Sequence, residues 1–190
     1  QWYNKENARL QSIKDKQKLS KSLTKRQANL LRKRENRVRD YLGKTAKKII
    51  SYCLEHNIGI IVLGKNKGFQ QKSDLGKVNN QIFVQMPFYK LQQKLEYQCK
   101  IYGIDMVEQE ESYTSKASFW DKDDIPVYGD SKQYSFSGKR VKRGLYQTSS
   151  GILLNADVNG ALNILRKSNV VSLIGLYSRG ELNTPVRIRV

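Results

Sequence analysis

Cysteine, acidic residues and long apolar runs are all scarce in this sequence, and each scarcity excludes a class of protein. The two cysteines, Cys53 and Cys99, are too few and too far apart for a disulfide framework or a zinc site. Both lie in helical patterns, where a buried packing thiol is expected. No stretch of about eighteen apolar residues is present to span a membrane, and the N-terminus lacks the apolar segment of a signal peptide. We therefore expect a cytoplasmic protein with no membrane partner.

Positive charge dominates what is present. Thirty-five Lys and Arg residues stand against 17 Asp and Glu residues in a chain of 190, a formal net charge of +18. Because neutralising phosphates releases condensed counterions, a chain this basic is expected to bind a polyanion, with nucleic acid first. The length suits one domain with a buried core, or one domain with an appendage.

A basic helical hairpin is predicted for residues 1–57. Residues 24–56 have the period of one long helix with Thr24 as its N-cap, and residues 4–19 form a shorter helix before a basic turn. One face of the long helix is an apolar stripe, formed by Leu31, Val38, Leu42, Thr45, Ile49 and Cys53. The opposite face carries a basic row, formed by Arg26, Lys33, Arg37, Lys44 and Lys48. Such a row can follow a phosphate backbone, and a merely solvated face is the alternative.

An α/β core is predicted for residues 58–167. Residues 58–63 (IGIIVL) are typical of a strand that is buried on both faces. Pro87 opens a helix that Gly103 closes, and a second strand follows at residues 104–109. A strand, a crossover helix and a second strand predict two parallel neighbouring strands.

Two less regular stretches complete the domain organisation. Residues 121–151 are predicted to be an irregular basic insert within the core, with KRGLY its most strand-like part. The insert contains a basic cluster of Lys139, Arg140, Lys142 and Arg143. Residues 168–190 show no strong period and are expected to form a C-terminal tail.

Three carboxylates form the candidate chemical site. Asp157 lies in the first turn of a helix capped by Asn155, where its simplest role is a favourable interaction with the helix dipole. Glu110 and Glu111 follow the second parallel strand, and α/β sheets form their sites beyond the carboxyl ends of such strands. Gly160 leaves open space beside Asp157. Carboxylates in a basic protein are suited to divalent cations that clamp a phosphodiester, so a metal-dependent nuclease is the sharper hypothesis.

Three segments resemble one known family. NADVNGALNIL (residues 155–165) resembles the third RuvC motif of TnpB, an RNA-guided DNA endonuclease of bacterial insertion-sequence transposons that is related to the type V CRISPR effectors. ESYTSKASFWD (residues 111–121) resembles the segment before the zinc ribbon of that family. The first eighteen residues, QWYNKENARLQSIKDKQK, resemble the helical linker after the first RuvC motif.

The resemblance implies a partial RNase H-like (RuvC) core whose opening strands are missing. It also implies two Mg²⁺ (or Mn²⁺) ions on three carboxylates, the third of which matches Asp157, and a guide RNA that selects a DNA target. The family's first catalytic Asp lies upstream of this sequence. The chain is therefore expected to be a C-terminal part that cleaves DNA only with the N-terminal remainder, or with another chain of a ribonucleoprotein. A bacterial, nucleoid-associated location follows from the same resemblance.

Two further departures from the family pattern concern the second carboxylate and the zinc. The usual catalytic Glu would fall near Gly64, where this sequence has no acid. Glu111 is therefore expected to be the relocated ligand, and Glu110 is the second choice. Ser118 occupies the position at which the family has the first cysteine of its zinc ribbon, and the insert contains no cysteine. No bound zinc is therefore expected. The residues expected to take over the nucleic-acid contacts of the ribbon are Arg140, Lys142 and Arg143. Lys116 is a further candidate for nucleic-acid binding.

Two other functions compete with the nuclease. The chain could be a nuclease-inactive RNA- or DNA-binding module or accessory subunit, which needs the basic residues but no acid cluster. A structural or assembly protein, whose long helix pairs with another chain, is the third hypothesis.

Overall fold

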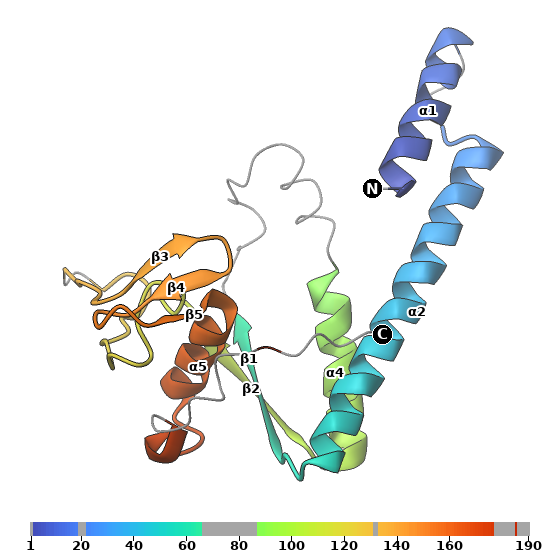
Figure 1. Cartoon of the computed structure of the whole chain (residues 1–190). Coiled ribbons are helices and arrows are strands. Elements are labelled where there is room, and N and C mark those ends of the chain that lie inside the picture. The colour runs from blue at the N-terminus through green and yellow to red at the C-terminus, as the bar shows by residue number, and fades with distance from the viewer. Residues whose placement is uncertain (1, 19–21, 66–86, 131–132, 177–184, 186–190) are drawn as a thin grey trace. The chain divides into compact units, whose positions relative to one another are not determined.

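The computed structural model describes residues 2–18, 22–65, 87–130, 133–176 and 185, which form two compact units (Figure 1). The first, called here the helical unit, consists of α1 (Trp2–Lys16), α2 (Lys25–Glu55) and α4 (Phe88–Tyr102). The second, called the strand unit, contains a helix and five strands: β1 (Ile60–Lys65), β2 (Asp105–Glu110), β3 (Lys139–Lys142), β4 (Leu145–Gln147), β5 (Leu153–Asn155) and α5 (Ala156–Ser168). A 3-10 turn at Ile174–Leu176 follows α5.

The first two helices form the expected antiparallel hairpin. Thr24 caps α2 through a capping box, because its Oγ1 accepts from the Gln27 backbone N–H at 3.2 Å and the Gln27 side chain accepts from the Thr24 N–H at 3.1 Å. Gln27 also donates to Gln11 of α1 at 3.0 Å. At the other end of α1, the Arg37 guanidinium lies 4.5 Å from the Trp2 ring centroid. Gln11 of α1 thus contacts the start of α2, and the start of α1 contacts the middle of α2, as in an antiparallel pair.

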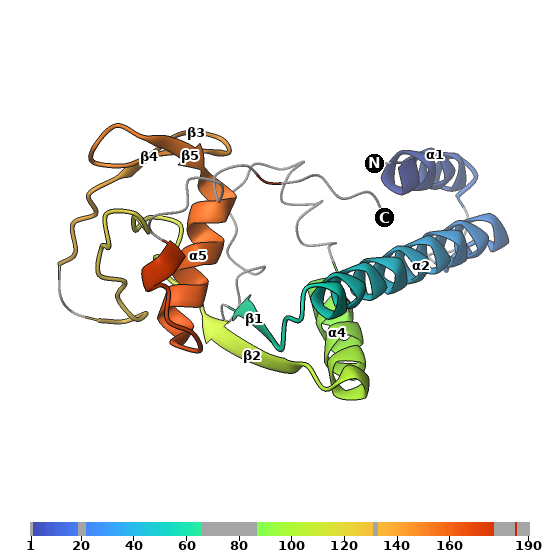
Figure 2. The same ribbon diagram turned by 60° about the horizontal axis from the view of Figure 1, so that its bottom comes forward.

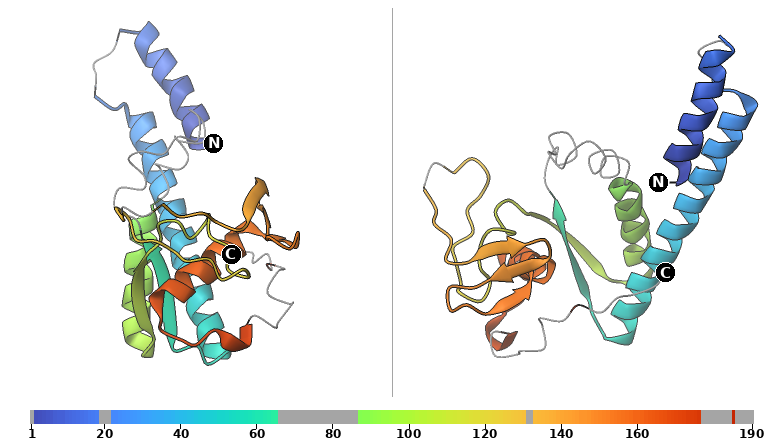
Figure 3. Two further views of the ribbon diagram at one scale, coloured as in Figure 1. Left: turned by 90° about the vertical axis from the view of Figure 1, so that its left-hand side faces the viewer. Right: turned by 45° about the horizontal axis from the view of Figure 1, so that its top comes forward.

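The third helix of this unit, α4, packs against α2 (Figure 3). Leu95 and Cys99 of α4 are buried, and Cys53 of α2 is also buried, so both thiols are packing groups as expected. Gly103 ends the helix at a φ of +67°. The sequence division placed this helix within a core of residues 58–167, whereas the structure groups it with the hairpin. Helical periodicity reveals an apolar face but not the partner that covers it.

Two parallel strands anchor the strand unit. β1 pairs with β2 in a register that runs from Ile60 opposite Asp105 to Lys65 opposite Glu110, as the strand, helix, strand order predicted. α5 packs against both strands. The carboxyl end of β2 therefore lies beside this helix, on which Asp157 is found.

A second, antiparallel sheet has the order β3, β4, β5 and lies at one end of α5 (Figure 2). The first two of these strands form a hairpin whose turn is at Arg143 and Gly144, inside the KRGLY segment that was predicted to be the most strand-like part of the insert. β5 was not predicted, because three residues are too short to show a period. Tyr146 and Leu154 form a buried cluster with Ala156.

Another apolar cluster of the strand unit includes a residue of the predicted tail. Leu173 is buried with Phe119 and Leu162. Residues 177–184 and 186–190 of that tail lie outside the described residues. Among the helices that the structure describes, none is long and apolar enough to cross a membrane.

Candidate nuclease site

The carboxyl end of β2 and the start of α5 bring two of the three predicted carboxylates to one cavity. Glu111 follows β2 directly, and Asp157 is the second residue of α5. Asn155 caps that helix as predicted, because its Oδ1 accepts from the backbone N–H of Asp157 at 2.9 Å and of Val158 at 3.1 Å. The cavity has a volume of about 370 Å³, and Glu111, Asp157 and Arg140 are among the residues that line it.

Two glycines provide the space in this cavity. A Cβ atom added to Gly64 of β1 would lie 2.3 Å from Oε2 of Glu111 and 2.8 Å from Cδ1 of Ile164. The Glu111 carboxylate therefore occupies space that any side chain at position 64 would fill. Gly160 lines the cavity, and no atom lies within 4 Å of the position that its Cβ would take, which agrees with the open space expected there.

Glu110, the alternative ligand, is held by another part of the unit. Its Oε2 forms an ion pair with Nζ of Lys167, and its Oε1 accepts from the Ser112 backbone N–H at 2.7 Å. Only 10% of the Lys167 side chain is exposed, and its ammonium also donates to the Pro126 carbonyl at 2.9 Å. The Glu110 carboxylate thus neutralises a buried cation and does not line the cavity described above.

The pKa values of the two neighbouring glutamates move in opposite directions. Burial raises the pKa of Glu110, but the hydrogen bonds from Lys167 and Ser112 outweigh this effect and leave the pKa below its usual value. Burial raises the pKa of Glu111, and the nearby charge of Glu110 raises it further. A carboxylate whose charged form is disfavoured gains from a cation placed beside it.

Two buried asparagines fix the segment between the carboxylates. Asn159 and Asn163 lie one turn apart on α5 and are fully buried. Asn159 accepts from the Phe119 N–H at 3.0 Å and donates to the Ala117 carbonyl at 2.8 Å. Asn163 donates to the carbonyls of Ala117 at 2.7 Å and Thr114 at 2.9 Å. These bonds pin the loop that follows Glu111 to the helix that carries Asp157.

A second group of polar residues ties the insert together. Oγ of Ser118 donates to Asp121 at 2.6 Å, and Ser149 donates to the same carboxylate from its backbone N–H at 3.0 Å and from Oγ at 2.6 Å. Asp123 accepts from the backbone N–H groups of Ser118 at 2.8 Å and Ser137 at 3.0 Å. We call these five residues the carboxylate–serine cluster. It crosslinks three segments of the strand unit.

Burial and hydrogen bonding also set the chemistry around this cluster. Burial raises the pKa of Asp121, but hydrogen bonds from Ser118, Ser149 and Ser137 outweigh it and lower the pKa. The fully buried Tyr146 donates to the Lys116 carbonyl at 2.8 Å. Burial, followed by the charges of the two aspartates of the cluster, raises the pKa of Tyr146 to about 12, so its hydroxyl remains a donor.

The predicted nucleic-acid-binding residues lie on exposed surfaces of both units. In the helical unit these are Arg26, Lys33, Arg37, Lys44 and Lys48, all on α2. Lys44 is paired with Asp40 at 2.9 Å, so an acid at helical spacing does interrupt this row. In the strand unit the exposed residues are Lys116, Arg140, Lys142 and Arg143. Arg140 alone of all these residues lines the cavity with the carboxylates.

Several residues of this site were not found by sequence reasoning. Gly64 was noted only as a departure from a pattern, and Lys167 and Asp121 were not assigned any role. The spacing of Asn159 and Asn163, four residues apart among the apolar positions of α5, was the available signal, because side chains at that spacing share a face and buried amides need hydrogen-bond partners.

Comparison with known proteins agrees with the resemblance seen in the sequence. Residues 88–164 match the model of the Cas12f1-like TNB domain, and residues 1–70 match a model described as a probable transposase, OrfB of IS605. The chain is 27% identical over 173 residues to the TnpB-like protein ORF457 of Acidianus two-tailed virus, which covers 88% of this chain and 34% of that relative. A solved complex of Cas12f1 with sgRNA and target DNA matches with a TM-score of 0.56 at 22% identity, over 85% of this chain and 40% of that one.

These matches define a chain of mixed α/β fold that is related to transposon proteins and to Cas12f1. Taken together, the matches support a protein of the TnpB type. It spans about a third of the length of the viral relative and 40% of the Cas12f1 chain.

Proposed function

We propose that the chain carries two carboxylates of a magnesium-dependent DNA cleavage site in an RNA-guided endonuclease of the TnpB type. The observation that supports this proposal is the cavity shared by Glu111, Asp157 and Arg140, with Gly64 leaving room for the first of these side chains. On this proposal the strand unit is part of an RNase H-like (RuvC) core.

The side chains present suit a hard divalent cation. Glu111 and Asp157 offer oxygen ligands, which Mg²⁺ and Mn²⁺ prefer. Partial burial and the charge of Glu110 raise the pKa of Glu111, so its charged form would gain from a cation. Within the described residues, however, no group of three His, Cys, Asp or Glu side chains is close enough to hold a metal. The third carboxylate of the site would come from another part of the protein or its complex.

The residues of this chain would have separate roles in phosphodiester hydrolysis. When bound, the cation would stabilise the attacking and leaving oxygens of the phosphodiester. Arg140 would bind a non-bridging phosphate oxygen, since a guanidinium pairs well with phosphate. The ion pair between Glu110 and Lys167 would position the end of β2, so that Glu111 faces the cavity.

RNA and DNA are the proposed partners. The exposed basic residues of both units would bind phosphates, and the related Cas12f1 structure is a complex with sgRNA and target DNA. In this proposal a guide RNA selects the target.

We also propose that the insert folds without zinc. The carboxylate–serine cluster joins Ser118, Ser137 and Ser149 through two carboxylates, so hydrogen bonds already provide the crosslink that a metal ion would supply. Serine hydroxyls are not the thiolate or imidazole ligands that structural zinc requires. We expect purified protein to contain no stoichiometric zinc and its melting temperature to be unchanged by a zinc-selective chelator. One bound zinc per chain would contradict this.

The cleavage proposal is tested by Asp157→Ala in the complete ribonucleoprotein. We expect cleavage of target DNA to be abolished and DNA binding to be retained, because only the former needs the cation. Undiminished cleavage by this variant would remove Asp157 from the site.

A nuclease-inactive binding module is the second candidate. The absence of a third carboxylate near the other two, among the described residues, favours it. The two candidates share every basic feature, so only a measurement of metal binding or cleavage separates them.

A further inference from the structure

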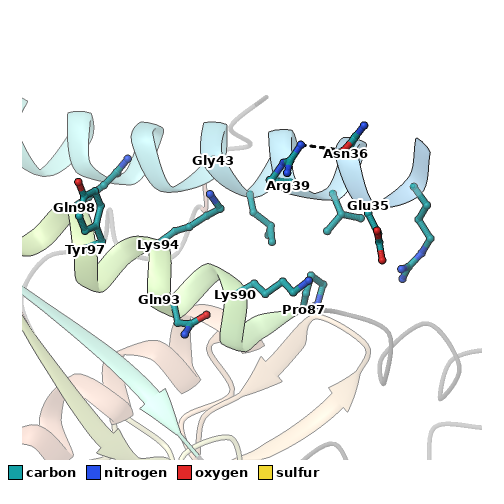
Figure 4. Close-up of a pocket in the computed structure, with 13 residues that line it drawn as sticks. Glu35, Asn36, Arg39, Gly43, Pro87, Lys90, Gln93, Lys94, Tyr97 and Gln98 are labelled. Carbon is teal, nitrogen blue, oxygen red and sulfur yellow. Dashed lines mark hydrogen bonds between the residues drawn. The ribbon is translucent and has the colours of Figure 1, made fainter. Parts of the chain in front are cut away.

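A second hollow surface lies in the helical unit, between α2 and α4. This α2–α4 groove has a volume of about 780 Å³ (Figure 4). Val38 and Leu42 of α2 contribute apolar surface to it, and Pro87 at the start of α4 lies at one end. None of the residues that line it belongs to the basic row predicted from the sequence.

The groove is strongly cationic. Four basic residues line it: Arg34, Arg39, Lys90 and Lys94. Glu35 is the one acidic residue of the lining. Across the described part of the chain, none of the four is within ion-pair distance of a carboxylate. The first turn of α4 has no acidic residue, so the positive end of its helix dipole adds to this field.

Several of these cations are already held in place. The Arg34 guanidinium lies 5.1 Å from the Tyr3 ring centroid, and Nη2 of Arg39 donates to Oδ1 of Asn36 at 3.0 Å. Lys94 extends from α4 toward α2, where its Nζ would lie 4.0 Å from a Cβ at Gly43 (Figure 4). Cations that are oriented before binding lose less conformational entropy when a ligand arrives.

Aromatic and amide groups line the same groove. Tyr97 is 67% exposed, which leaves its ring available for stacking with a base. Oε1 of Gln98 is buried and has no hydrogen-bond partner among the described residues, and it belongs to the lining. Phosphate-binding cations beside an exposed ring and an amide are the combination that binds single-stranded nucleic acid.

We propose that the α2–α4 groove binds a single-stranded segment of RNA. The groove runs along the surface between two helices in contact, whose axes typically lie about 8–10 Å apart, so it can follow one phosphate backbone and its bases but is too narrow to enclose a duplex. RNA is favoured over DNA because unpaired strands with bases open to stacking are the usual form in which proteins recognise RNA. This inference deepens the proposed function, since it locates the RNA contact on a surface separate from the carboxylates.

The test is a fluorescence-anisotropy titration of the full chain, in EDTA, with an oligouridylate of roughly ten nucleotides. The variant is Lys90→Gln with Lys94→Gln. We expect affinity about tenfold weaker and a slope of log K against log salt that is shallower by about 1.4, because each phosphate contact on a single strand contributes about 0.7. The matched control is Lys47→Gln with Lys100→Gln, which removes the same charge from exposed positions of the same two helices outside the groove.

Two further variants test the ring and the acid. Tyr97→Ala should weaken binding by about fivefold or more, while Tyr97→Phe keeps the stacking surface and the affinity. Glu35→Gln should strengthen binding, because it removes the one carboxylate of the groove. Circular dichroism melting curves check that each variant remains folded.

Three outcomes would overturn the inference. Equal losses in the two double variants would mean that binding depends on overall charge and not on the groove. If oligothymidylate binds as tightly as oligouridylate or more tightly, RNA is not the preferred ligand. If the chain binds an acidic peptide but neither oligonucleotide, the groove belongs to a protein partner. None of these measurements depends on cleavage. Loss of the RNA-binding inference would therefore not contradict the proposed carboxylate site, and failure of the carboxylate site to cleave DNA would not affect the RNA-binding test.

Discussion

The helical unit and the strand unit are stabilised by different kinds of contact. In the helical unit, apolar faces with a helical period meet, and residues such as Leu42, Ile50 and Leu95 are buried. In the strand unit, the segments between the short strands are fixed largely by side chains that hydrogen-bond to backbone groups, led by Asn159 and Asn163. Apolar packing tolerates exchange of similar shapes, whereas a buried polar contact requires one particular group.

Asn159 provides the largest expected contrast between the units. Asn159→Leu keeps the approximate volume but removes the acceptor of the Phe119 N–H, at about 1–3 kcal/mol. It also removes one of the two donors to the Ala117 carbonyl, which Asn163 still serves. Leu95→Met in the helical unit should cost less than about 1.5 kcal/mol. Chemical denaturation of both variants measures the difference. Similar losses in the two would show that the units are not distinguished in this way.

The two glutamates at the end of β2 should have opposite effects on stability. Glu110→Gln removes the negative charge that neutralises the nearly buried Lys167. The free energy of unfolding should fall by about 1–3 kcal/mol at neutral pH. Because the pKa of Glu110 is lowered in the folded state, its contribution is present above the ordinary carboxyl pKa and is lost as the pH falls.

Glu111→Gln should instead raise the melting temperature near neutral pH in metal-free buffer, by a smaller amount. The raised pKa of Glu111 means that its charged form destabilises the fold as the pH rises above the ordinary carboxyl pKa. The gain should disappear in acid, where the wild-type carboxyl is also protonated. Scanning calorimetry at several pH values tests both glutamates, and shifts of the same sign in the two variants would contradict the roles assigned to them.

The smallest effect is expected on the exposed surface of the helical unit. Asp40 and Lys44 form an ion pair in which both side chains are more than 60% exposed. Asp40→Asn should change the free energy of unfolding by no more than about 0.5 kcal/mol, because solvent screens such pairs. A loss above 1 kcal/mol, measured by the same denaturation experiment, would mean that surface charge contributes to this unit more than its packing suggests.

The contrast between the units also explains how much could be predicted from the sequence. The hairpin, the Thr24 cap, the parallel strands and the capped helix at Asn155 were all predicted, because each has a local period or a capping residue. The packing of α4 against α2 was not, since an apolar face does not name its partner. The carboxylate–serine cluster was missed because its hydrogen-bonded partners are separated by up to 28 residues in the chain and form no motif.

The candidate site shows the same division. The sequence singled out Asp157 and the two glutamates as acids at element ends, which is local information. The exclusion of Glu110 from the cavity depends on Lys167, which lies 57 residues further along the chain, and the room for Glu111 depends on a glycine of the neighbouring strand. Tertiary contacts of this kind leave no local pattern.

Manganese binding tests the central claim most directly. Titration of the full chain with Mn²⁺, followed by electron paramagnetic resonance of the free ion, should show binding that strengthens as the pH rises through the raised pKa of Glu111. Glu111→Gln and Asp157→Asn should each abolish it, while Asp105→Asn, at the opposite end of β2, should leave it unchanged. If wild-type protein binds no Mn²⁺, or if both site variants bind it as wild type does, then these carboxylates do not form a metal site.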